Sequence, residues 1–179
     1  MFRLSMRCLL VAAGAAAWAA FPGPLAADEQ PPVPGCTDPE YRRLDFKLGE
    51  FEVTGIGGAR AGDSRVESIL GGCMLVEHWR GAISGLGRAH MFYDKGDGLW
   101  HLVYVTDDGE TMYLSGRFEG DSLVLTGEND FDVFTGLHRM SFSPLPDGAS
   151  RQFWELSTDG GATWKVVHEG FYARRRQAG

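Results

Sequence analysis

The chain has few cysteines and histidines, and the way they are spaced argues against the usual metal sites. Its 3 cysteines form no Cys-x-x-Cys pair, and its 5 histidines form no His-x-His or His-x-x-x-His pair. A zinc site would therefore have to be assembled from separate segments of the chain. We expect no metal centre, and we interpret the scattered histidines as ordinary residues of a folded domain: His78, His90, His101, His138 and His168.

Long hydrophobic runs are also missing, except at the N-terminus. There Arg3 and Arg7 precede the apolar run "LLVAAGAAAWAAF", which is short for a membrane span. Small residues follow in "PLAAD", so we predict an export signal over residues 1–27 and a periplasmic or secreted protein. A retained membrane anchor is the alternative.

Positive charge is in deficit. The chain has 17 Lys+Arg against 24 Asp+Glu, and losing the two signal arginines would lower the net charge from −7 to about −9. Such a surface repels nucleic-acid phosphates and anionic lipid. The one basic cluster lies in the segment 174–179, which we interpret as a solvated tail. We expect no nucleic-acid partner and no membrane partner after signal removal, and the sequence predicts no particular oligomeric state.

No window of helical length shows an apolar period of 3.6 residues, so little helix is expected. A Pro-rich, polar lead-in over 28–43, which we expect to be flexible, is followed by short runs rich in Val, Tyr, Phe and Trp, with Gly/Asp clusters between them. This pattern predicts about ten antiparallel strands within a single domain over 44–173.

Both faces of these strands carry large apolar side chains. In "LWHLVYV", Trp100, Leu102 and Tyr104 share one face, and the opposite face is also largely apolar. A sandwich strand usually has one clean polar face, whereas mixed faces suit a barrel with a partly polar interior. The fold class expected is all-β, an up-and-down antiparallel barrel, with a sandwich as the alternative.

Removal of the signal would take Cys8 with it and leave two cysteines. Two cysteines in an exported chain favour a disulfide, here between Cys36 and Cys73, across the open end of the barrel. The alternative is two unrelated thiols.

The stretch "STDGGATW" resembles the Asp-box of sialidases and related β-propellers. One such box in a short chain indicates a turn and not a propeller. We therefore predict a structural hairpin before the last strand, formed by Ser157, Asp159, Gly161, Thr163 and Trp164.

Four segments together resemble a bacterial family of small, often exported, lipocalin-like proteins of unknown function: "LDFKLGEFEVTG", "SRVESILGGCMLVEHWRG", "HMFYDKGDGLWHLVYV" and "SPLPDGASRQFWELSTDGGATWKVVHEGFY". The resemblance implies a ten-stranded up-and-down barrel of the lipocalin or calycin type, and it brings no established reaction. The family's opening motif resembles Phe-Asp-Phe-Trp-x-Gly-x-Trp, and this chain has Lys47 and Phe51 at the two Trp positions.

A resemblance to nitrobindin-type barrels, which hold haem through one His near the C-terminus, implies His168 as an alternative haem ligand. The glycine-rich opening motif of that family is absent, so no cofactor is our first expectation.

The alternation of side chains along the strands favours a binding pocket inside the barrel. We expect six residues to point inward and bind a small apolar or amphipathic molecule: Glu77, Trp79, Trp100, Tyr104, Gln152 and Trp154. A buried Glu77 should find an arginine or stay neutral. A one-residue slip would instead place Arg139, Arg151, Phe153 and Glu155 inside.

Two alternatives remain open at this point, although we expect binding in preference to catalysis. One is an enzyme that uses the same cavity with a carboxylate such as Glu77 as general acid or base. The other is an envelope or protein-interaction module whose barrel is solidly packed.

Overall fold

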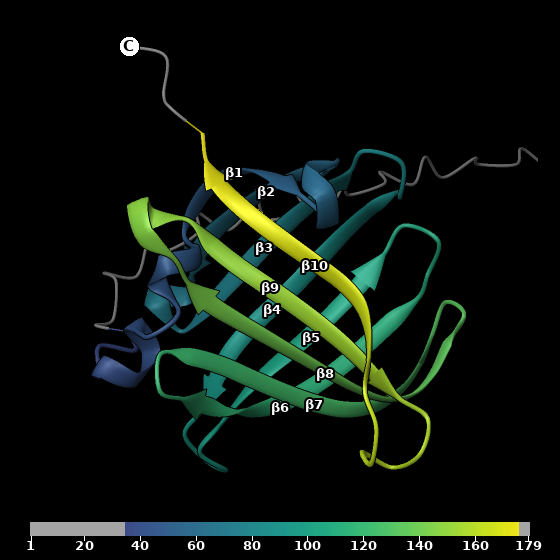
Figure 1. Cartoon of the computed structure of the whole chain (residues 1–179). Helices are drawn as coiled ribbons and strands as arrows, with labels where there is room; N and C mark the ends of the chain where they lie inside the picture. Colours follow the sequence, from purple (N-terminus) through teal and green to yellow (C-terminus); the bar gives the residue numbers. More distant parts are fainter. Residues whose placement is uncertain (1–34, 176–179) are drawn as a thin grey trace, which may run out of the picture. The chain divides into compact units, whose positions relative to one another are not determined.

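Ten antiparallel strands close into an up-and-down barrel in the computed structural model, which describes residues 35–175 (Figure 1). The predicted fold class is confirmed. The strands are β1 (Gly49–Thr54), β2 (Arg60–Ile69), β3 (Met74–Gly81), β4 (Leu86–Asp94), β5 (Leu99–Thr106), β6 (Thr111–Glu119), β7 (Ser122–Phe131), β8 (Phe134–Pro144), β9 (Ser150–Ser157) and β10 (Lys165–Arg174).

Each strand pairs with its neighbours in sequence, and β10 returns to pair with β1. The closing pair places Val53 opposite Tyr172 and Phe51 opposite Arg174. Closure removes the exposed strand edges that an open sheet would present. Three short 3-10 turns lie in the connections: η3 (Ile56–Gly58), η4 (Leu70–Gly72) and η5 (Pro146–Gly148).

The residues before β1 cover one end of the barrel. They form the 3-10 helices η1 (Pro39–Arg42) and η2 (Asp45–Lys47), and Leu44 between them is fully buried. Trp100 at the start of β5 donates its indole N–H to Glu40 at 3.0 Å, and Arg43 donates to the Gly120 carbonyl at 2.8 Å. This N-terminal segment therefore closes the end that holds the β4–β5 and β6–β7 turns.

The disulfide between Cys36 and Cys73 is present, as the sequence predicts. Cys73 directly precedes β3 and follows η4, so the bond lies at the covered end and not at the open one. The prediction that the bond crosses the open end of the barrel is therefore wrong, because Cys73 lies at the end that the η1–η2 segment covers. Of the predicted lead-in, residues 35–43 are described and include η1; the predicted signal over 1–27 lies outside the described residues.

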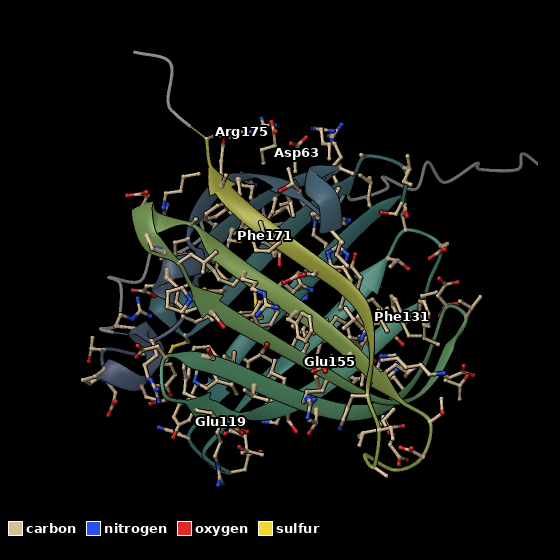
Figure 2. All side chains as sticks on the ribbon, viewed as in Figure 1. Asp63, Glu119, Phe131, Glu155, Phe171 and Arg175 are labelled. Atoms are coloured by element: carbon tan, nitrogen blue, oxygen red, sulfur yellow. A yellow bond between two sulfur atoms is a disulfide. The ribbon has the colours of Figure 1, made fainter. Side chains whose placement is uncertain are left out.

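The last strand extends one residue beyond the predicted domain boundary, through Arg174. Arg174 donates to the carbonyls of Leu48 at 2.7 Å and Gly148 at 3.0 Å, which fixes it against the barrel. Arg175 pairs with Asp63 on β2, and the two lie side by side in Figure 2. The start of the predicted solvated tail is thus bound to the fold by hydrogen bonds and an ion pair.

Apolar side chains fill the interior near the covered end, including Trp100, Phe142 and Leu125. The outer wall carries ion pairs such as Arg139 with Glu155 at 2.9 Å and Arg151 with Glu169 at 2.6 Å. The alternative register, which would bury these charges, is therefore not the one observed. None of the helices within residues 35–175 has the length and apolar character that a membrane crossing requires.

Candidate functional site

A cavity of about 400 Å³ occupies the half of the barrel opposite the N-terminal segment. Its walls come from eight strands, and its mouth lies among the β3–β4, β5–β6 and β7–β8 connections. The lining is mainly apolar and aromatic, with a few polar groups deep inside. This composition is typical of sites that hold small molecules.

Five of the six residues proposed from the sequence as ligand contacts line this cavity: Glu77, Trp79, Tyr104, Gln152 and Trp154. Trp100 does not. It shares the inward face of β5 with Tyr104, but it lies at the covered end, where it is 1% exposed and packs edge-on against Phe118. Strand alternation therefore placed Trp100 on the inward face, but Trp100 contributes to the core and not to the cavity wall.

Two of the large rings in the cavity wall lie over glycines of neighbouring strands. A Cβ at Gly62 on β2 would come within 2.7 Å of the Trp79 ring, and a Cβ at Gly87 on β4 would overlap the Tyr104 ring. The missing side chains leave room for the rings to lie flat against the sheet. Gly62 and Gly87 thus help to fix the shape of the wall.

A continuous aromatic wall follows the mouth side of the cavity. Tyr104 contacts Phe131 with ring centroids 6.0 Å apart, and Phe131 contacts Trp154 at 5.8 Å in an edge-on arrangement. Phe134 also meets Trp154 edge-on at 5.8 Å. Such contacts are favoured by the quadrupoles of the rings and hold them in defined orientations.

His138, which sequence reasoning did not select, orients Trp154. The Trp154 indole N–H donates to His138 Nδ1 at 3.0 Å, and the two rings are stacked 5.6 Å apart. His138 Nε2 lies 3.0 Å from the Phe134 carbonyl oxygen. Because an indole can only donate, Nδ1 must be the acceptor and Nε2 carries the proton. His138 therefore fixes the Trp154 ring from behind.

The floor of the cavity holds a buried carboxylate. Glu77 on β3 is 6% exposed and accepts a hydrogen bond from the Ser64 hydroxyl at 2.5 Å. Its second oxygen lies 3.5 Å from Lys47 Nζ. The expectation that Glu77 would find an arginine or stay neutral is corrected, because its partner is Lys47 from η2. The sequence pattern did not predict that this lysine would be buried.

Lys47 is buried beneath the cavity and does not line it. Its side chain is 1% exposed, and Nζ lies over the rings of Phe142 at 4.2 Å and Tyr172 at 4.4 Å. Within residues 35–175, Nζ has no regular hydrogen-bond acceptor, so its contact with Glu77 is an ion pair of loose geometry. Burial lowers the pKa of Lys47, and the Glu77 carboxylate opposes this shift. Lys47 occupies the position at which the resembled family carries Trp.

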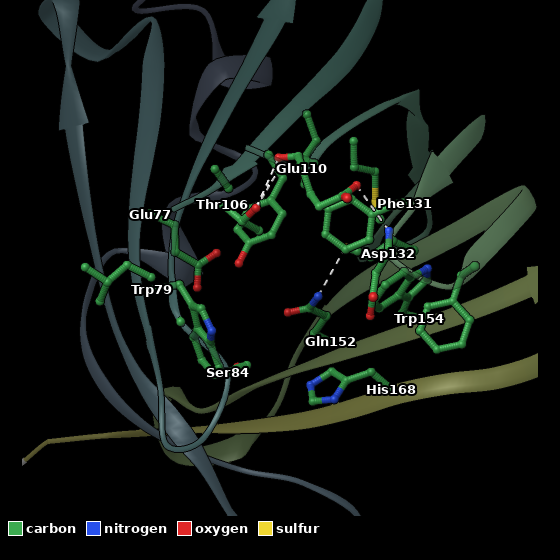
Figure 3. A pocket seen from close by; sticks show the side chains of 18 of the residues that line it. Glu77, Trp79, Ser84, Thr106, Glu110, Phe131, Asp132, Gln152, Trp154 and His168 are labelled. Carbon is green, nitrogen blue, oxygen red and sulfur yellow. Dashed lines mark hydrogen bonds between the residues drawn. The ribbon is translucent and has the colours of Figure 1, made fainter. Parts of the chain in front are cut away.

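Gln152 and Tyr172 complete the polar floor. The Tyr172 hydroxyl donates to Gln152 Oε1 at 2.5 Å, and Gln152 Nε2 lies 3.2 Å from the Met140 sulfur. Burial, followed by the nearby Glu77 carboxylate, raises the pKa of Tyr172 well above its usual value. Figure 3 shows the side chains of Glu77 and Gln152 pointing toward each other across the cavity.

His168 faces the cavity from β10. The register between β9 and β10 shifts between Val166 and His168, and this bulge brings His168 opposite Trp154 on the inward face. Burial lowers the pKa of His168, while the neighbouring Glu169 carboxylate acts weakly in the other direction. At neutral pH the ring is therefore an uncharged donor and acceptor.

The mouth is acidic. Asp107, Asp108 and Glu110 come from the β5–β6 connection, and Asp132 comes from the β7–β8 turn. Tyr104 lies between these groups and the floor. Burial, then the charges of Glu77, Asp107 and Asp108, raise its pKa to about 12. The Tyr104 hydroxyl therefore stays protonated at any physiological pH.

The Asp-box residues form the β9–β10 turn and do not line the cavity. Asp159 accepts from the Thr163 backbone N–H at 2.9 Å and from its hydroxyl at 2.6 Å. Ser157 Oγ accepts from the Gly161 N–H at 2.8 Å, and the Trp164 indole donates to the Gly161 carbonyl at 3.1 Å. These bonds are all internal to the turn.

Within residues 35–175, one group of side chains has the spacing of metal ligands: Asp94, Asp97 and His101 at the β4–β5 turn. This group lies at the covered end, away from the cavity.

No family model matches the sequence, and no curated protein matches it either.

Proposed function

We propose that this protein is an exported barrel that binds a small amphipathic molecule in its interior. The observation that carries the proposal is the cavity of about 400 Å³, lined by aromatic rings and open at one end. A barrel that served only as a packed module would fill this space, because voids in protein interiors are costly. The size lies within the range of pockets for small molecules.

The polar groups of the floor support binding in preference to catalysis. One Glu77 oxygen accepts the Ser64 hydroxyl hydrogen bond, and the other faces Lys47. A general acid or base needs an oxygen free to reach the substrate. With both oxygens engaged, Glu77 is better suited to holding the barrel floor and polarising one end of the cavity.

Two further observations support the proposed location and the proposed family membership. The Cys36–Cys73 disulfide is typical of proteins from oxidising compartments, which accords with the periplasmic or secreted location predicted from the N-terminal sequence. The closed ten-stranded barrel has the architecture that the resemblance to exported lipocalin-like proteins implies. We include membership of that family in the proposal.

Haem is not part of the proposal. His168 lines the cavity, but the same lining holds five carboxylates and neither lysine nor arginine. The two anionic propionates of haem would meet like charges at the mouth without a cation to balance them. The residues around His168 therefore fit haem poorly.

The direct test is to search for a co-purified molecule by native mass spectrometry of the protein isolated from its own host. A second test uses the neutral dye N-phenyl-1-naphthylamine, whose fluorescence rises in apolar surroundings. We expect the wild type to bind the dye and Ala89→Phe, which fills the cavity, to lose most of that binding. Ala173→Phe, on the outer face of β10, is the matched control. Equal dye binding by both variants would overturn the proposal.

A further inference from the structure

The charge around the cavity is of one sign. The lining contains five carboxylates and no lysine or arginine: Glu77, Asp107, Asp108, Glu110 and Asp132. Four of these carboxylates lie at the mouth, whereas Glu77 on the floor is paired with Lys47, so the unbalanced negative charge lies at the mouth. Pockets of uniform sign concentrate ligands of opposite charge.

The four mouth carboxylates lack basic partners. Asp108 accepts a hydrogen bond from the Thr106 hydroxyl, and Glu110 accepts the backbone N–H of Asp132 at 3.2 Å. Within residues 35–175, none of the four takes part in an ion pair. Elsewhere on the surface, carboxylates such as Glu155 and Glu169 do have arginine partners.

Lys47 balances the charge of Glu77 on the floor, and it forms no ion pair with the mouth carboxylates. Its ammonium lies behind Phe142 and Tyr172, and the residue is not part of the lining. His168, the one lining group that could become cationic near neutral pH, is kept uncharged by burial, which lowers its pKa. Burial, and after it the charges of Glu77, Asp107 and Asp108, raise the pKa of Tyr104, which lies between mouth and floor.

A single metal ion does not fit the mouth. The only group within residues 35–175 with metal-ligand spacing is Asp94, Asp97 and His101, at the other end of the barrel. No three of the mouth carboxylates thus lie close enough together to hold one ion. An organic cation needs no such convergence, because its charge is spread over a larger volume.

The aromatic wall provides the second half of the recognition. The faces and edges of Trp79, Tyr104, Phe131 and Trp154 line the same space as the carboxylates. Organic cations, and quaternary ammonium groups in particular, are attracted to aromatic faces as well as to carboxylates. An anionic ligand would gain from the rings but would be repelled by the mouth.

We propose that the molecule held in the cavity is an organic cation: a small amine or quaternary ammonium compound with an apolar or aromatic body. The cationic group lies among the aromatic wall and the mouth carboxylates, and the body extends toward Gln152 and Glu77 on the floor. This inference rests on the proposed function, because it names the class of ligand for the same cavity.

The test compares three probes of equal shape and different charge. They are the cation (3-hydroxyphenyl)trimethylammonium, the neutral 3-tert-butylphenol and the anion 3-hydroxybenzenesulfonate. Isothermal titration calorimetry at low ionic strength should give the cation at least about tenfold tighter binding than the neutral probe, with the sulfonate weakest. Added salt should weaken only the cation markedly, because the mouth charges are screened.

A double variant, Asp107→Asn with Asp132→Asn, should lower the ratio of the affinity for the cation to the affinity for 3-tert-butylphenol severalfold. Asp121→Asn in the β6–β7 turn, at the covered end, is the matched control and should bind like the wild type. Circular dichroism and thermal unfolding would verify that all variants are folded.

The outcomes separate the two proposals. If 3-tert-butylphenol or the sulfonate binds as tightly as the cation, the inference about charge is overturned and binding in the cavity stands. An unchanged preference in the double variant also overturns it. If none of the three probes binds and the neutral dye does not bind either, the proposed function fails together with the inference.

Discussion

Lys47 and Glu77 form an ion pair in the interior of the barrel, with Nζ and Oε2 3.5 Å apart and both side chains more than nine-tenths buried. The pair joins η2, in the segment that covers one end, to β3 in the wall. Buried ion pairs rarely add net stability over an apolar pair, but they are costly to break. This pair therefore fixes how the covering segment seats on the barrel and sets the depth of the cavity floor.

The first prediction concerns this pair. Lys47→Met should lower the free energy of unfolding by about 3–5 kcal/mol, because Glu77 would be left buried without a cation. Lys165→Met, at an exposed position of β10, is the matched control and should change stability little. Urea unfolding measures both.

A double variant makes the prediction sharper. Adding Glu77→Leu to Lys47→Met removes both charges and should recover much of the lost stability, since two apolar groups can replace a buried pair. A double variant less stable than either single variant would show that the pair itself is strongly stabilising, contrary to our account.

The second prediction follows from the lowered pKa of His168. In the unfolded chain this ring gains a proton near pH 6.5, whereas in the folded protein it gains one only at lower pH. Below about pH 6.5 the unfolded state thus binds more protons, and stability falls as pH decreases. His168→Gln should show a shallower fall between pH 7 and 5 in thermal unfolding. A slope equal to that of the wild type would contradict the burial-driven shift.

Strand order and inward faces could be read from the sequence, but depth along the barrel could not. Alternation in β5 places Trp100 and Tyr104 on one inward face, yet they lie at opposite ends of the strand, and only Tyr104 reaches the cavity. Which end is filled depends on the η1–η2 segment, and that segment carries no strand period. Its position comes from long-range contacts such as the hydrogen bond between Trp100 and Glu40.

Lys47 and His138 were missed for related reasons. A lysine outside the strands is ordinarily exposed, so no local signal marks Lys47 as buried. His138 is one of several histidines in strands, and its contact with Trp154 depends on the pairing of β8 with β9. One available signal was that Lys47 stands where the resembled family's opening motif has Trp, because Trp is on average a highly buried residue type.

The third prediction concerns the β9–β10 turn. Ser157→Ala should cost about 1–3 kcal/mol, because Ser157 is buried and its hydroxyl accepts the Gly161 N–H. Binding of N-phenyl-1-naphthylamine should be unchanged once the variant is folded, because Ser157 does not line the cavity. Altered affinity with unchanged stability would show that the turn has a direct role in binding.

Asp159 adds a pH signature to the same turn. Its hydrogen bonds with Thr163 and Ser157 hold its pKa well below the usual range, so its contribution is present above about pH 4 and is lost as pH falls further. Asp159→Asn should be less stable than the wild type at pH 7, and the difference should shrink below about pH 4. A difference that does not vary with pH would contradict this assignment.

The fourth prediction concerns the disulfide. Cys36 and Cys73 are 37 residues apart, and in the chain-entropy model a loop of that size stabilises the fold by about 3–4 kcal/mol. Cys36→Ser with Cys73→Ser should lose that amount in urea unfolding. Thiol titration of the unreduced, unfolded chain from residue 28 onward should detect no free thiol. Two free thiols would show that the bond does not form.

The last prediction tests the orientation of Trp154 and the charge of the mouth together. Trp154 is half-buried, with its N–H bound to His138 and its ring lining the cavity, so quenchers reach it only through the mouth. The neutral quencher acrylamide should reach the ring more readily than iodide, because iodide must pass the carboxylates of Asp107 and Asp132. The Trp154 signal is obtained by difference between the wild type and Trp154→Phe, at constant low ionic strength. The double variant Asp107→Asn with Asp132→Asn should raise the quenching of Trp154 by iodide and leave its quenching by acrylamide unchanged. If iodide quenches Trp154 in the wild type as freely as in the unfolded chain, the indole faces bulk water, and the cavity cannot be its surroundings in solution.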